Sequence, residues 1–158
     1  MINDQPAPSD SLKNLRIVHL SMLSGLVFFA IIAYYIRNNT GSLLGPRELS
    51  ILTYISLIFI LIEIPLGYWL HSRKMKTLAD KPDLNSKLDI YKVSHIVKIA
   101  MYEGAGFFSC LVLLLGGKNP VLIQILVVII IMLLETPSAT KLANDMDLSS
   151  GDKDLLDS

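Results

Sequence analysis

Residues 93–134 read VSHIVKIAMYEGAGFFSCLVLLLGGKNPVLIQILVVIIIMLL, which is two apolar runs separated by a turn sequence. The first run is long enough to cross a hydrocarbon core of about 30 Å as a helix rising about 1.5 Å per residue. The second run is shorter and rich in β-branched residues. A strand in lipid would leave its amide groups without hydrogen bonds, so a helix is expected there too. The residues GGKNP at 116–120 predict a tight turn between the two helices. The stretch therefore predicts a helical hairpin in a membrane.

The composition of the whole chain supports a membrane protein. Of its 158 residues, 52% are apolar, and the mean hydropathy of +0.52 is high for a soluble domain. Fourteen Lys and Arg balance fourteen Asp and Glu, so no basic surface for nucleic acid is expected. Cys110 is the single cysteine and cannot form a disulfide within the chain.

We expect an all-α polytopic membrane protein with four transmembrane helices arranged as two hairpins. The third helix is predicted to begin in the aqueous phase and to run for about 30 residues. The predicted parts are an N-terminal segment at 1–16, spans at about 17–36, 51–70, 93–115 and 121–137, a polar loop at 71–92 and an acidic tail at 138–158.

The distribution of Lys and Arg predicts the orientation of these spans. Ten of them lie in the N-terminal segment, the middle loop and the tail, whereas three lie in the two connections on the other side. Positively charged loops stay in the cytoplasm, so both termini and the middle loop are predicted to be cytoplasmic.

The two hairpins share a short sequence pattern. Residues 17–25, IVHLSMLSG, align with residues 96–104, IVKIAMYEG, with four identities in nine positions. Glu-Ile-Pro at 63–65 aligns with Glu-Thr-Pro at 135–137. The pattern indicates a tandem duplication, and the alternative is coincidence among apolar residues.

Charged residues within the spans are costly and need a partner, water or a proton. Glu63 and Lys98 are predicted at matching depth, roughly 8–10 Å below the cytoplasmic boundary, which favours an ion pair between the second and third helices. Glu103 falls near the midplane. It is either a proton or cation carrier, tuned by Tyr102, Lys98 and Glu63, or a structural group hydrogen-bonded to Ser24 or Tyr102.

One face of the third helix is predicted to point toward protein rather than lipid. Its polar residues Tyr91, His95, Lys98 and Tyr102 follow one another at spacings of four, three and four, which places them in one stripe. Small residues allow another helix to approach closely. Those predicted to pack helices are Ser21, Ser24 and Gly25 on the first helix and Gly104 and Gly106 on the third.

The remaining polar residues are given structural roles. Glu135 is expected to be solvated near the interface, with Lys141 or a histidine as its partner. His19 and His95 are expected to be isolated boundary residues. No catalytic, metal-binding or cofactor-binding motif occurs in the sequence, so neither an enzyme nor a cofactor is predicted.

The segment from residues 96–109 to the turn resembles small uncharacterised four-span membrane proteins of Bacteroidota-type bacteria. The features that carry the resemblance are Glu-Gly at 103–104, Asn-Pro at 119–120 and Pro-Ser at 137–138. It implies a bacterial inner-membrane protein and brings no established activity. A helix that carries a Glu, continues with small and apolar residues and ends at Asn-Pro is also similar to the ion-carrying helix in the hairpins of rotary ATPase proteolipids. Here, however, the Glu lies on the first helix of its hairpin and the Gly-rich packing helix is missing.

Two functions follow as hypotheses. The first is a non-enzymatic accessory or assembly subunit of a larger membrane complex, with the lipid bilayer and another membrane protein or a second copy as partners. The alternative is a proton- or cation-handling module that uses Glu103.

Overall fold

The computed structural model describes residues 8–78 and 84–146, and every regular element within these ranges is a helix. This confirms the predicted all-α class. The elements are α1 (Pro8–Thr40), α2 (Pro46–Met75), a single 3-10 turn η1 (Lys76–Leu78), α3 (Leu84–Leu114), α4 (Asn119–Leu134) and α5 (Ala139–Asp145). Helices α1, α2 and α3 are long and apolar enough to cross a membrane. Helix α4 counts as a fourth crossing only together with α5, from which it is bent by 83°.

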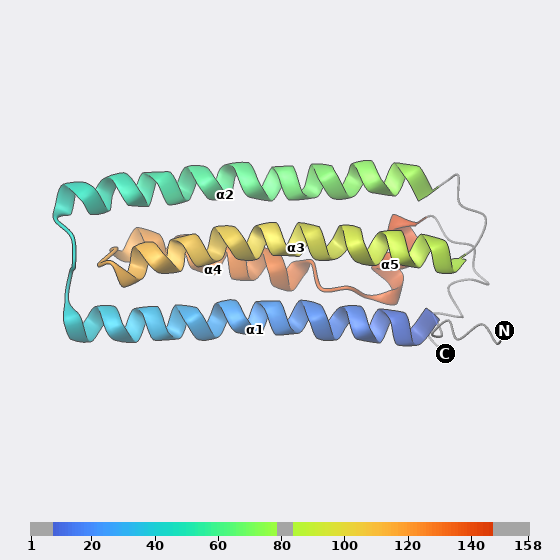
Figure 1. The fold of residues 1–158 in the computed structure, drawn as a ribbon, viewed down its shortest axis with the longest axis horizontal. Helices are drawn as coiled ribbons and strands as arrows, with labels where there is room; N and C mark the ends of the chain where they lie inside the picture. Colours follow the sequence, from blue (N-terminus) through green and yellow to red (C-terminus); the bar gives the residue numbers. More distant parts are fainter. Residues whose placement is uncertain (1–7, 79–83, 147–158) are drawn as a thin grey trace.

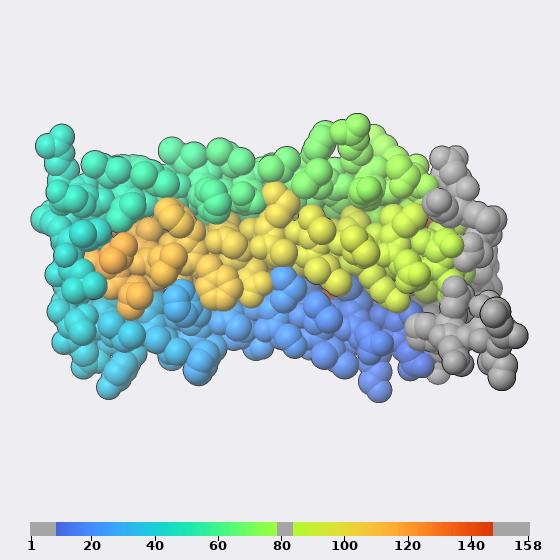
Figure 2. Space-filling view, viewed as in Figure 1, coloured from blue at the N-terminus to red at the C-terminus, as the bar shows by residue number. Residues whose placement is uncertain are grey.

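The three long helices lie side by side, with α3 between α1 and α2 and α4 against α3 (Figure 1). Side chains of α3 fill the space between α1 and α2 along the face shown in Figure 2. Helices α1 and α3 begin at the end where α2 finishes and α5 lies, and we call this the α5 end. The opposite end, where α1 connects to α2 and α3 to α4, is the turn end. Helix α3 is therefore the centre of the bundle, as predicted.

Glycines shape the connections at the turn end. Gly41, just after α1, and Gly116, just after α3, have φ angles of 75° and 115°, a region in which residues with a side chain are strained. The two connections are joined because the Leu43 amide donates to the Leu115 carbonyl at 3.1 Å. Helices α2 and α4 each begin with a proline in the first turn, where its missing N–H costs nothing.

The apolar core forms where α1, α3 and α4 meet. Leu26, Ala105 and Val128 are all completely buried. A side chain at Gly106 would collide with Leu26, since a Cβ atom there would lie 2.7 Å from its Cδ2 atom and 3.2 Å from Val128 Cγ1. The absence of a side chain at Gly106 therefore lets α3 approach α1 and α4 closely, and burying this apolar surface stabilises the bundle.

The helices extend beyond two of the predicted span boundaries. Helix α2 continues to Met75, and α3 begins at Leu84, within the polar connection at 71–92 as predicted for the third helix. The α3 length of 31 residues agrees with the prediction. Helix α4 ends at Leu134, within the fourth predicted span at 121–137. Pro137 lacks the N–H for a helical hydrogen bond and disfavours helical geometry in the residue before it, which favours this early end, although α2 accommodates Pro65. Most of the predicted acidic tail lies outside the described residues.

Candidate functional site

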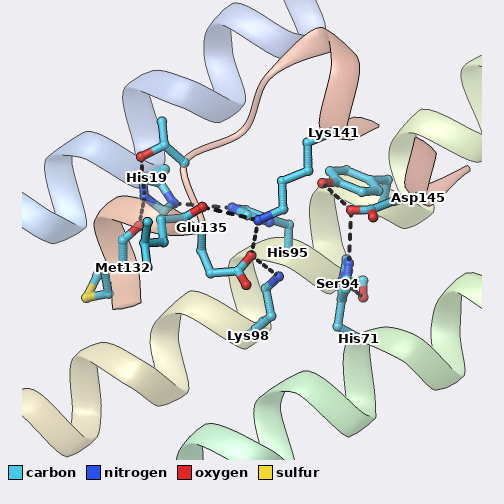
Figure 3. Close-up of polar contacts among 12 residues, drawn as sticks. His19, His71, Ser94, His95, Lys98, Met132, Glu135, Lys141 and Asp145 are labelled. Atoms are coloured by element: carbon cyan, nitrogen blue, oxygen red, sulfur yellow. Dashed lines mark hydrogen bonds and ion pairs between the residues drawn. The ribbon is translucent and has the colours of Figure 1, made fainter. Parts of the chain in front are cut away.

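The three histidines of the chain meet at the α5 end (Figure 3). His19 comes from α1, His71 from α2 and His95 from α3, and each is at most 5% exposed. The ring centroids are 5.4 Å apart for His19 and His95 and 6.2 Å apart for His71 and His95. The prediction that His19 and His95 are isolated is therefore wrong. Their contact depends on the register of three helices, which sequence spacing alone does not give.

Hydrogen bonds define the protonation of the His19–His95 pair. His19 Nε2 lies 3.0 Å from the Met132 carbonyl oxygen, which can only accept, so this nitrogen carries a proton. His19 Nδ1 lies 3.2 Å from His95 Nε2. With both rings neutral, His95 donates to His19. His95 Nδ1 is then a buried acceptor for which the described residues supply no partner.

His71 connects α2 to α3 and α5. Its Nδ1 atom lies 2.8 Å from Ser94 Oγ, and its Nε2 atom lies 3.9 Å from Asp145 Oδ2. The Tyr91 hydroxyl donates to the same Asp145 oxygen at 3.1 Å, and the Tyr91 ring stacks on His95. Asp145 belongs to α5, beyond the bend that ends α4.

The neighbours of the Asp145 carboxyl affect its pKa. Burial alone would raise its pKa. The His71 ring and the Tyr91 hydroxyl outweigh burial and hold the pKa of Asp145 below its usual value. The charged form of Asp145 is therefore the one that attaches α5 to α2 and α3.

Lys98 is 2% exposed and pairs with Glu135, not with Glu63 as predicted. Its Nζ atom donates to Glu135 Oε2 at 2.8 Å. Lys141, on α5, donates to the same oxygen, which is one of the partners predicted for Glu135. Glu63 makes no hydrogen bond or ion pair with the described residues. Glu135 directly follows the last residue of α4, Leu134, and its side chain reaches Lys98 of α3 (Figure 3).

A cavity of about 200 Å³, lined mainly by residues with polar or ionisable groups, borders this network. It has room for several water molecules, each of which occupies about 30 Å³ in the liquid. Its lining comes from α2, α3, α5 and the segment before α5, and consists of Tyr68, His71, Ser72, Met75, Lys98, Glu135, Lys141 and Asp145. The site is thus a network of ionisable groups beside a space that can hold water.

The predicted stripe on α3 is buried over its whole length. Tyr91, His95, Lys98 and Tyr102 are each at most 2% exposed. Tyr102 packs against Gly67 of α2, where a Cβ atom would lie 3.0 Å from Tyr102 Cε1. Gly67 is a helix-packing residue that the sequence did not indicate.

Glu103 lies apart from the network, on the α1–α3 face. It is partly exposed and makes no hydrogen bond or ion pair with the described residues. The expected bond to Ser24 is absent, because Ser24 donates to the Ser21 carbonyl of its own helix. The Glu103 Oε1 atom would lie 3.6 Å from a Cβ atom added at Gly25. Ser21, Ser24 and Gly104 are exposed nearby, and a Cβ at Gly104 would meet only open space.

Metal binding finds no support in the described ranges, where no three His, Cys, Asp or Glu side chains converge as a metal site. No family model, curated protein or solved structure matches the chain. The geometry of the network and of the Glu103 face is therefore the basis on which a function is inferred.

Proposed function

We propose that the chain is a non-enzymatic, proton-responsive membrane protein whose titratable site is the network at the α5 end. The observation that carries this proposal is the meeting of three buried histidines from three helices with the ion pairs of segment 135–145. Imidazole is the side chain whose charge ordinarily changes between pH 5 and 8. Ionisable groups buried in a membrane protein commonly mark a functional site.

The His71–Asp145 contact is the part of the network in which a histidine ring faces a carboxylate beyond hydrogen-bond distance. His71 Nε2 lies 3.9 Å from Asp145 Oδ2 and has no hydrogen bond with the described residues, whereas Nδ1 is bonded to Ser94 Oγ. At His95, by contrast, the neighbouring groups include Lys98 and the other two rings as well as Glu135. A positive charge on the His71 ring would therefore strengthen the attachment of α5, and a neutral ring would leave it weaker.

The topology that fits this role has four spans in two hairpins, with α4 as the fourth and both termini in the cytoplasm. The excess of Lys and Arg at the α5 end supports this orientation. In that arrangement the network faces the cytoplasmic side of a bacterial inner membrane and responds to the pH there. The parallel course of α1 and α3 is compatible with a tandem duplication (Figure 1).

Proton sensing is favoured over proton transport by what lies between the two ends. A second polar group, Ser56 with Gln124, is buried toward the turn end. The buried cluster that the described helices share is almost entirely apolar, with Ile60, Ile99 and Val128 among its members and the Tyr102 hydroxyl as its main polar group.

The test measures the attachment of α5 directly. Spin labels on Lys76→Cys and Asn144→Cys, both exposed positions, report the distance between the end of α2 and α5 in lipid vesicles, while Cys110 is buried. We expect a narrow distance distribution at pH 5.5 and a broader one at pH 8. His71→Gln and Asp145→Asn should remove this difference, whereas Asp10→Asn, a control carboxylate at the start of α1, should retain it.

If the protein with the unsubstituted network gave the same distance distribution at pH 5.5 and pH 8, the proposal would be contradicted. Proton flux into vesicles above that of protein-free vesicles would replace sensing by transport.

A second candidate function is that of a subunit in a larger membrane complex, and Glu103 favours it. An unpaired carboxyl on a face of exposed small residues is costly in lipid, so a partner helix that donates a hydrogen bond at that depth would stabilise it. Purification in mild detergent should retain a stoichiometric partner that Gly104→Leu and Glu103→Leu both release. Isolation of the unsubstituted chain alone would exclude this function.

A further inference from the structure

A groove of about 380 Å³ lies between α2 and α3 at the α5 end, and Ser94 is the one residue of its lining that also belongs to the network. Its walls are apolar and outward-facing: Val93 and Val97 on α3 are 64% and 44% exposed. Its complete lining is Leu70, Lys74, Asp89, Ile90, Val93, Ser94 and Val97. The groove therefore combines an apolar floor with two charged residues, one from each helix.

The two charges are available to a ligand. Lys74 is exposed and its ammonium group has no hydrogen bond or ion pair with the described residues. Asp89 has one long contact, from Lys92 Nζ to Oδ1 at 3.4 Å. Lys92 is held more closely by Ser11 of α1, at 2.9 Å. The Asp89 Oδ2 atom is left without a bond to the described residues.

We propose that this groove binds a phospholipid whose headgroup carries both a phosphate and a primary ammonium, as phosphoethanolamine does. One acyl chain lies along Val93 and Val97, Lys74 pairs with the phosphate, and Asp89 accepts hydrogen bonds from the ammonium. A quaternary ammonium has no N–H to donate, and a phosphoglycerol headgroup offers Asp89 only neutral hydroxyl donors beside its negative phosphate. The opposite charges on the two walls thus select a zwitterionic headgroup with a primary amine.

The experiment is native mass spectrometry of the full-length protein released from vesicles of equal phosphatidylethanolamine, phosphatidylcholine and phosphatidylglycerol. One hydrogen bond to a charged group corresponds to roughly a tenfold preference, so we expect about 3- to 10-fold enrichment of phosphatidylethanolamine. Asp89→Asn should reduce this enrichment to the level of phosphatidylcholine. Lys74→Gln should lower the retention of all three lipids, and Lys76→Gln, a control cation outside the groove, should change nothing.

Two further arms test the position of the acyl chain. Val93→Trp should displace the retained lipid. If the Val93→Trp protein does not fold, Val97→Phe tests the same point. Soluble glycerophosphoethanolamine, which has the headgroup without acyl chains, should not compete. Equal retention of the three lipids, an enrichment that survives Asp89→Asn, or competition by the soluble headgroup would each overturn the proposal.

Discussion

The two ends of the bundle bury polar groups of different kinds. At the turn end, Ser56 donates to Gln124, and Gln124 Nε2 donates to the Thr53 carbonyl at 3.2 Å. These groups are neutral over the physiological pH range. At the α5 end, Lys98 and the three histidines are buried instead, with Glu135 and Asp145 as counter-charges. The neutral end can only fix helix register, whereas the ionisable end can also change its interactions with pH.

The largest expected effect at the α5 end is that of Glu135→Gln. It leaves Lys98 buried without its carboxylate, and removing one partner of a buried ion pair costs about 3–5 kcal/mol. Thermal unfolding in detergent, followed by circular dichroism, measures the loss. The double variant with Lys98→Met should recover much of the stability, because it removes the unpaired charge as well. A single variant as stable as the parent, or a double variant no better than the single one, would show that the pair does not stabilise this end.

At the turn end, Gly116→Ala should have the next largest effect. The φ angle of 115° is strained for alanine, and its Cβ atom would lie 2.8 Å from Ser42 Cα. We expect a loss of about 1–3 kcal/mol that does not vary with pH. Gly104→Ala is the matched control: this glycine is helical and faces open space, so alanine should be neutral or slightly stabilising. Equal effects of the two substitutions would refute the strain argument.

Ser56→Ala should cost about 1 kcal/mol, the net value of one neutral hydrogen bond. Unfolding midpoints at pH 5.5 and pH 8 should shift by the same amount relative to the parent. A shift that depended on pH would mean that the turn end is coupled to a titrating group.

Asp145→Asn should have the smallest effect on stability, below about 1 kcal/mol, because the Asp145 side chain is 32% exposed. The pKa of Asp145 is lower in the folded protein than in the unfolded chain, where it is about 3.9. Its contribution is therefore present above pH 4 and is lost as the pH falls through the lower folded value. Unfolding midpoints of parent and variant should converge as the pH falls below about 4. Midpoints that stay equally separated would contradict the lowered pKa.

Spacing within one helix was enough to predict part of this site. The separations of four, three and four place Tyr91, His95, Lys98 and Tyr102 on one face of α3, and this face is buried. The partner of Lys98 was not predictable from its depth, because it depends on where α4 ends. Pro65 stays inside α2, whereas the chain leaves the helix before Pro137, so the two Glu-x-Pro segments have different structures.

His71 was missed for a related reason. It lies at the start of the segment predicted as a polar loop, yet α2 continues to Met75 and turns this residue toward α3. The signal that could have found it is the apolar-to-polar transition at 70–71, which marks a helix leaving the membrane as readily as it marks a loop.

The chain has three histidines, and all of them lie within the network, so their signals can show whether it responds to protons. In protein labelled with 15N histidine and placed in lipid, the imidazole nitrogen signals report the protonation of this site alone. We predict that at least one imidazole takes up a proton between pH 8 and pH 5 while the helices stay folded, and that the other two signals shift with it. The substitution Asp145→Asn should change the pH at which this imidazole takes up its proton. Three imidazoles that keep the same charge throughout this range, or that titrate independently of one another and of Asp145, would contradict a proton-responsive network.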